Sequence, residues 1–111
     1  MKQLHNHKEF ISYLRNNKQT LVYFFKDSCI KCKELKEDVN KIYEWSIMEK
    51  IEFCKVDINE DDILRTLFGE YGVPTFILFE GDRDGKEIPY PKNGYNKEYI
   101  INYLRGINEQ L

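Results

Sequence analysis

The chain has 111 residues, of which 41% are hydrophobic, enough for one domain with an ordinary core. It carries 17 basic and 19 acidic residues, a net charge of −2, so it has no basic field that would hold nucleic acid. Its apolar stretches are far shorter than the ~20 residues of a membrane helix, and its first residues lack the apolar core of a signal peptide. We therefore expect a single cytoplasmic domain over residues 1–111, with no membrane and no nucleic acid as a partner.

The first half of the chain alternates between helical and strand patterns. Asn6 followed by Glu9 is typical of a helix start, and this helix ends near residue 16. Residues 21–25 form a continuous apolar run, typical of a strand that is buried on both faces. The next helix is predicted from Cys32 to Met48, and because it contains no proline we expect little kink in it. Residues 51–58 predict the second strand.

The second half adds shorter elements. We predict a short helix that Gly69 closes, a third strand over residues 76–79, an edge strand over residues 86–90, and a final helix after Gly94. Strands that alternate with helices indicate a parallel βαβ unit, and the hairpin signal near residue 81 adds antiparallel strands. The sequence thus predicts an α/β fold, with a mixed sheet of about four to five strands and helices on both faces.

The residues that carry chemistry are Cys29 and Cys32, a C-x-x-C pair between the first strand and the helix that follows it. Unpaired N–H groups and the helix dipole favour an anion at a helix start, so a thiolate is stabilised there. We expect Cys29, nearer the exposed end, to be the nucleophile, and Cys32, one turn in, to resolve the mixed disulfide. Lys26, Lys31 and Lys33 should lower the pKa of Cys29 further.

Metal binding is the alternative for these cysteines. The three cysteines of the chain are an odd number, which argues against the disulfide framework of a secreted domain. Cys54 fits best as a small buried thiol in a strand, although a zinc site of Cys29, Cys32 and Cys54 stays open, without an evident fourth ligand. His5 and His7 could also bind a metal, but two histidines at a mobile terminus are more often incidental. We expect no metal site.

A second constellation, Gly72-Val73-Pro74-Thr75, stands directly before the third strand. With it, the chain resembles the thioredoxin family over nearly its whole length. The matching pieces are Val22–Phe25 before the motif, Cys29-x-x-Cys32-Lys33, Lys55–Asn59, Tyr71–Phe79 and Gly94 before the last helix.

The resemblance implies a thioredoxin fold and a thiol–disulfide oxidoreductase. In that family the residue at Pro74 is cis and packs against the disulfide, and the backbone of the residue at Val73 pairs with an extended substrate segment. The implied partners are protein disulfides and a thioredoxin reductase or similar electron donor. The redox-active Cys29–Cys32 disulfide would serve without a bound cofactor, in a cytosolic reductant, and nothing in the sequence demands more than a monomer.

Several residues depart from the family pattern, and one of them is Ser28, which stands where the family has a tryptophan beside the nucleophile. Ile30 and Lys31 replace the usual Gly-Pro between the cysteines, and the cation of Lys31 favours a stronger oxidant because it stabilises the thiolate. Tyr23 stands where the family has a buried aspartate, and with a pKa of ~10 it is a poor base.

Lys55 matches the lysine that normally pairs with that aspartate. Without a partner, we expect Lys55 either to reach outward or to have a lowered pKa, which would let it take the proton of Cys32. A solvated Lys55 without a catalytic role is the simpler interpretation. These departures also keep open a catalytically weak binding module that uses the groove beside Pro74.

Overall fold

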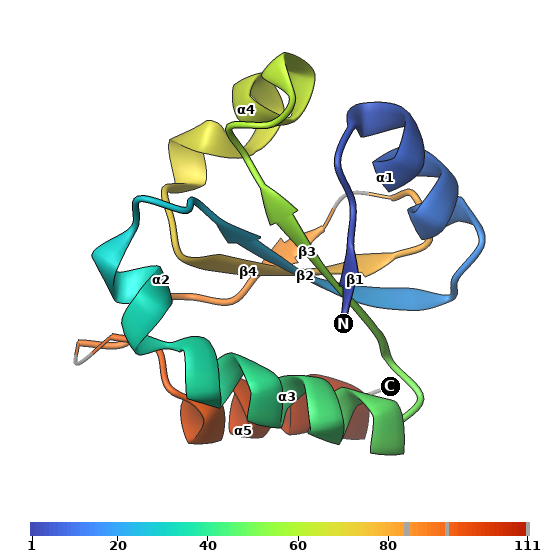
Figure 1. Cartoon of the computed structure of the whole chain (residues 1–111). Coiled ribbons are helices and arrows are strands. Elements are labelled where there is room, and N and C mark those ends of the chain that lie inside the picture. Colours follow the sequence, from blue (N-terminus) through green and yellow to red (C-terminus); the bar gives the residue numbers. More distant parts are fainter. Residues whose placement is uncertain (84, 93, 111) are drawn as a thin grey trace.

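The computed structural model describes residues 1–83, 85–92 and 94–110. Within them, one five-stranded sheet with the strand order β1-β3-β2-β4-β5 forms the middle layer (Figure 1). Strands β1 (Lys2–Gln3), β2 (Gln19–Phe25) and β3 (Glu52–Asp57) run parallel, whereas β4 (Thr75–Glu80) and β5 (Lys86–Glu87) are antiparallel additions. The predicted mixed sheet is confirmed.

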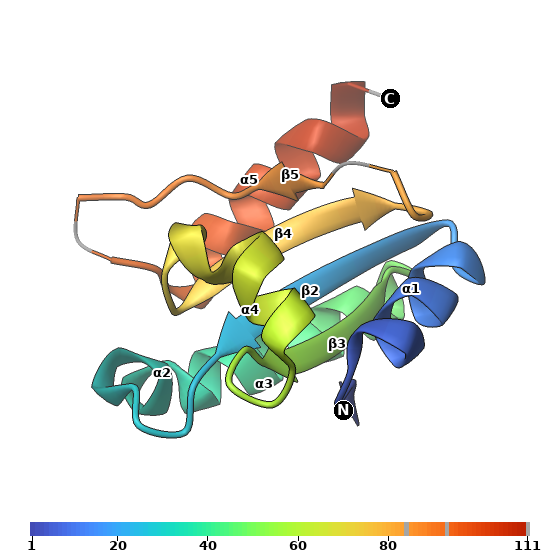
Figure 2. The same ribbon diagram turned by 90° about the horizontal axis from the view of Figure 1, so that it is seen from above.

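Helices cover both faces of the sheet, as predicted. In Figures 1 and 2, α1 (His7–Arg15) and α4 (Asp62–Phe68) lie on one side, and α3 (Lys36–Met48) and α5 (Lys97–Gln110) on the other. A short helix, α2 (Ile30–Glu34), follows β2, and a 3-10 turn, η1 (Gly69–Tyr71), follows α4. No helix in the described ranges has the length and apolar character that crossing a bilayer requires.

The core has two apolar layers because successive strand residues point to opposite faces of the sheet. Leu21 and Tyr23 of β2 join the cluster that α3 and α5 cover, whereas Val22 and Phe24 join the cluster that α1 and α4 cover. The strand β2 therefore contributes apolar side chains to both layers, which explains why residues 21–25 do not alternate with polar residues.

Two local predictions were wrong. The single helix expected from Cys32 to Met48 is two helices, α2 and α3, divided at Leu35. Helical hydrogen bonds continue on both sides of the division, from Leu35 N–H to Lys31 O at 3.1 Å and from Val39 N–H to Leu35 O at 2.8 Å. Figure 1 shows that the ribbon turns between α2 and α3, so the chain changes direction at a buried leucine without a proline.

The N-terminal segment is also more ordered than expected. Lys2 and Gln3 pair with β3, and the N–H of Leu4 donates to the carbonyl of Lys55 at 3.0 Å. Leu4 itself is buried in the layer beneath α1 and α4. This pairing places the first residues at one edge of the sheet, next to β3, instead of leaving them as a mobile terminus.

Candidate active site

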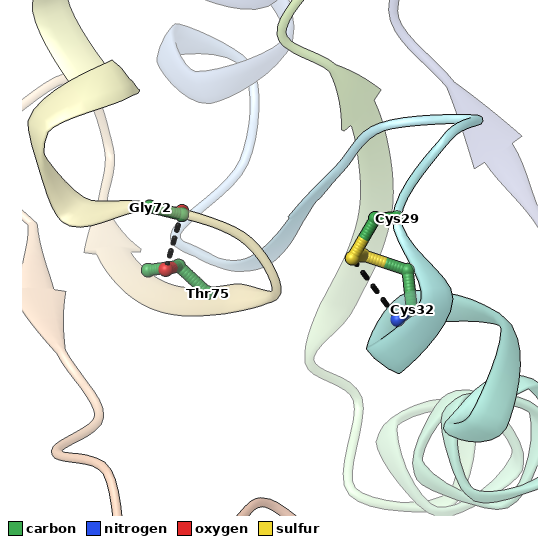
Figure 3. Close-up of a disulfide and its surroundings, with 4 residues drawn as sticks. All are labelled: Cys29, Cys32, Gly72 and Thr75. Carbon is green, nitrogen blue, oxygen red and sulfur yellow. Dashed lines mark hydrogen bonds between the residues drawn. A yellow bond between two sulfur atoms is a disulfide. The ribbon is translucent and has the colours of Figure 1, made fainter.

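Cys29 and Cys32 lie at the start of α2, with their Sγ atoms at disulfide distance and their Cα atoms 5.2 Å apart. Cys29 is the N-cap residue, and its Sγ accepts the backbone N–H of Cys32 at 3.1 Å (Figure 3). Cys29 is partly exposed, whereas Cys32 is only 7% exposed. A partner disulfide can thus approach Cys29 but not Cys32, which is the order of access expected for a nucleophile and a resolving thiol.

A tight turn after β2 produces this arrangement. The N–H of Cys29 donates to the carbonyl of Lys26 at 3.1 Å, and the N–H of Lys33 then donates to the carbonyl of Cys29 at 3.2 Å. The turn carries the chain out of the buried strand and starts the helix at the cysteine. Ile30 follows at 74% exposure, so the bulky residue between the cysteines faces solvent instead of the core.

The Val73–Pro74 turn lies at the same end of the sheet as the cysteines. Because Thr75 pairs with Phe24 across the antiparallel β2–β4 ladder, the turn stands at the end of β2 from which the chain continues to Cys29. The peptide bond between Val73 and Pro74 is cis, as the family resemblance implied. Pro74 is buried and Val73 is half-buried.

Gly72 and Thr75 hold this turn closed. The Thr75 hydroxyl donates to the carbonyl of Gly72 at 2.7 Å, the bond drawn opposite the disulfide in Figure 3. Gly72 has φ +78°, a left-handed conformation that favours glycine. The sequence therefore places a glycine where the backbone needs one, and the hydroxyl three residues later fixes the position of Val73 and Pro74.

Tyr23 is buried in the layer beneath α3, at 5% exposure. Its ring stacks on Phe25 and Phe76, with centroid separations of 5.7 and 4.8 Å. Burial raises the pKa of Tyr23 to about 12, above its usual value of 10.0. At neutral pH Tyr23 therefore keeps its proton, and it cannot act as the base that the aspartate of the family supplies.

Among the described residues no carboxylate pairs with Lys55, and its side chain is not fully solvated either. It is half-buried, and its Nζ lies 5.7 Å from the centroid of the Phe25 ring. An ammonium over an aromatic face gains a favourable electrostatic contact that a lone buried cation lacks. Whether Lys55 takes part in exchange stays a prediction.

A cavity of about 270 Å³ brings Cys32, Tyr23 and Lys55 together. Lys31 does not reach it: this exposed lysine lines a separate hollow with Tyr90. Lys36 and Asn40 are among the lining residues that were not predicted. Their spacing from Lys33, three and seven residues on, marks one face of a helix and could have pointed to them.

Cys54 lies away from this cavity. Strand alternation places it in the layer that α1 and α4 cover, fully buried, whereas its neighbour Lys55 faces the cavity of Cys32. Burial raises the pKa of the Cys54 thiol to about 12. The pleat of β3 thus separates Cys54 from the C-x-x-C pair, and no group of three metal-ligating side chains occurs in the part of the chain that the structure describes.

The two histidines each meet a carboxylate. Nδ1 of His5 lies 2.7 Å from Glu60 Oε2, and Nδ1 of His7 lies 3.0 Å from Asp61 Oδ2. Asp61 also caps α4, because its Oδ1 accepts two backbone N–H groups of the first turn, each at 2.9 Å. The histidines therefore join the start of α1 to the start of α4.

Comparison with known proteins agrees with this geometry. The family model described as Thioredoxin matches residues 2–105. A chloroplastic thioredoxin-like protein, HCF164, of Arabidopsis thaliana is 30% identical over 96 residues, which are 85% of this chain and 36% of that protein. Thioredoxin-2 of Pyricularia oryzae is 33% identical over 86 residues, which are 77% of this chain and 47% of that protein.

Solved structures show the same fold. A thioredoxin from Trypanosoma brucei brucei superposes with a TM-score of 0.80 at 20% identity, covering 96% of this chain and 89% of that one. The thioredoxin of Fasciola hepatica gives 0.78 at 19% identity, covering 95% and 97%. The chain spans between 25% and 47% of the length of the curated relatives that it matches. The match to the family model covers nearly all of the sequence, and the chain belongs to the thioredoxin family.

Proposed function

We propose that the chain is a thiol–disulfide oxidoreductase that exchanges the Cys29–Cys32 pair with disulfides of protein substrates. One observation carries the proposal: a partly exposed cysteine caps α2 and lies at disulfide distance from a buried one. The Val73–Pro74 turn lies at the same end of the sheet, where the backbone of Val73 can pair with an extended substrate segment. Related proteins carry the names thioredoxin and protein disulfide-isomerase, which agrees with this chemistry.

The exchange has two steps. The Cys29 thiolate attacks one sulfur of the substrate disulfide, a Cys29–substrate bond forms, and the other substrate sulfur leaves and takes a proton. The Cys32 thiolate then attacks the Cys29 sulfur and releases the second substrate thiol. The substrate gains two electrons and two protons, and Cys29–Cys32 becomes a disulfide. A dithiol donor, a thioredoxin reductase or a similar system, reduces this disulfide again, so no bound cofactor is needed.

In this proposal the protein works as a reductant in the cytoplasm, as a monomer. Support comes from the third cysteine: Cys54 is a free, fully buried thiol, so the fold uses no cysteine for a structural disulfide, as is usual in a reducing compartment. The acidic balance of the chain agrees with protein partners instead of nucleic acid.

Reduction of insulin disulfides by the dithiothreitol-reduced protein tests the chemistry. We expect turnover in the wild type and in the Cys54→Ala control, and none above background in Cys29→Ser. Full activity in Cys29→Ser would overturn the proposal. Binding of a partner segment without turnover, surviving the loss of both cysteines, would instead identify a binding module in the same fold.

The reduction potential of the Cys29–Cys32 pair tests the proposed direction of electron flow, from this protein to its substrates. Thioredoxin has a potential of about −270 mV and the strong oxidant DsbA about −120 mV. We expect this chain to lie above the first value but nearer to it, because the Lys31 cation favours the thiolate, and we expect Lys31→Gln to lower the potential. Equilibration with glutathione buffers measures both proteins. A wild-type potential close to the DsbA value would contradict a role as reductant.

A further inference from the structure

Four lysines surround the cavity beside Cys32. Lys26, Lys33, Lys36 and Lys55 line its walls, and the only acidic residue among the described lining residues is the exposed Asp27. None of the ion pairs found among the described residues involves these four ammonium groups. The cavity therefore gathers four positive charges that no described ion pair neutralises, beside the single negative charge of Asp27.

This concentration of charge is local. The whole chain has a net charge of −2, so a cavity with four basic residues and one acidic residue runs against the overall balance. Ammonium groups around one hollow repel each other, and a bound anion relieves that repulsion. A negatively charged occupant would therefore be stabilised in this cavity.

The floor and size of the cavity indicate which anion fits. Tyr23, Phe25 and Val39 give it an apolar lining beneath the lysines. Its volume of about 270 Å³ lies just below the ~300–1,000 Å³ of pockets that hold whole small-molecule ligands. One aspartate or glutamate side chain, with a short aliphatic stem and a charged end, matches both the floor and the walls.

The position of the cavity places its occupant next to the redox-active cysteines. Cys32 lines the cavity, and Cys29, to which a substrate becomes covalently attached, is the N-cap of the same helix. Attachment at Cys29 raises the effective concentration of nearby substrate side chains, so a weak contact becomes sufficient. We propose that this lysine-lined cavity binds an acidic side chain of the substrate segment that carries the disulfide. The inference rests on the proposed function and adds a substrate class to it, namely disulfides with acidic flanking residues.

The test compares two peptides of the same length, each with one disulfide, whose flanking residues are either glutamate or lysine. The measured quantity is the ratio of kcat/KM for the acidic peptide to that for the basic one. For two or three partly exposed ion pairs we expect a ratio of about tenfold at low salt, and a smaller ratio in about 0.5 M salt because exposed charges are screened. Lys33→Gln/Lys36→Gln should bring the ratio close to one.

Lys8→Gln/Lys18→Gln is the matched control, since it removes the same number of exposed lysine charges outside the cavity; it should keep the ratio. Equal kcat/KM for the two peptides, or a preference that the Lys33/Lys36 variant retains, would overturn the inference. The inference is also overturned if the Lys33/Lys36 variant slows the reduction of glutathione disulfide as much as that of the acidic peptide. The cavity would then bind a small anionic disulfide instead of an acidic side chain of a substrate segment. If neither peptide nor 2-hydroxyethyl disulfide is reduced at all, the proposed function fails instead.

Discussion

Replacement of Gly72 by alanine tests the turn that presents Val73 and Pro74. Gly72 has φ +78°, and a Cβ added there meets nothing within 4 Å, so the substitution creates no steric clash with the rest of the protein. The remaining cost is backbone strain: Gly72 combines φ +78° with ψ −175°, a region essentially restricted to glycine, where another residue costs about 1–3 kcal/mol. For a domain of this size about 1 kcal/mol corresponds to about 4 °C in Tm, so we expect Gly72→Ala to lower Tm by about 4–12 °C.

Gly69→Ala is the control, three residues earlier. Gly69 has φ −61°, and its added Cβ would lie 3.6 Å from Arg65 Cγ, an ordinary contact. Alanine is compatible with that backbone and lowers the entropy of the unfolded chain, so its Tm should stay the same or rise. Thermal unfolding of the oxidised proteins, followed by circular dichroism, measures both variants. A Gly72→Ala protein as stable as the wild type would show that the turn does not need the left-handed conformation.

Three further changes have defined outcomes. Asp61→Ala should lower Tm, and Asp61→Ser should lower it less, because serine still caps α4 although it loses the contact with His7. Equal Tm values for the two variants would contradict the capping role. Burial raises the pKa of Cys54 from 9.0, and that of Tyr23 from 10.0, to about 12. The fold therefore favours the protonated forms, so the contribution of these two groups to the free energy of unfolding in urea should be constant from neutral pH to about pH 9 and fall toward pH 12; no fall between pH 9 and pH 12 would refute the burial of these groups. Tyr23→Asp in a Cys29→Ser background should raise the pKa of Cys32, read from thiolate absorbance, because a carboxylate in the same cavity disfavours a second negative charge; an unchanged pKa would separate position 23 from the thiol.

The sequence predicted those parts of the protein that depend on local pattern. The apolar run of residues 21–25, the C-x-x-C pair behind it and the Gly72–Thr75 segment each occupy a few consecutive residues, and each has the predicted role in the fold. The sequence also predicted that Cys54 is a small buried thiol, because it stands in the middle of a predicted strand.

Other features depend on contacts between distant segments. The pairing of Lys2 and Gln3 with β3 involves too few residues for a strand pattern to be visible. No proline marks the division at Leu35, after which α3 begins with Lys36 and contributes Lys36 and Asn40 to the cavity. The lysine-lined cavity joins residues from β2, α2, α3 and β3, so only the assembled sheet shows that these charges meet beside Cys32.

The most direct test of the account is mass spectrometry of the reduced Cys32→Ser protein after incubation with a disulfide peptide, under conditions that preserve disulfides. Without the resolving thiol, the account predicts a stable adduct of one peptide chain on Cys29, and none on the buried Cys54. An unmodified Cys29, or an adduct found on Cys54 instead, would contradict the claim that Cys29 is the nucleophile of a thiol–disulfide exchange.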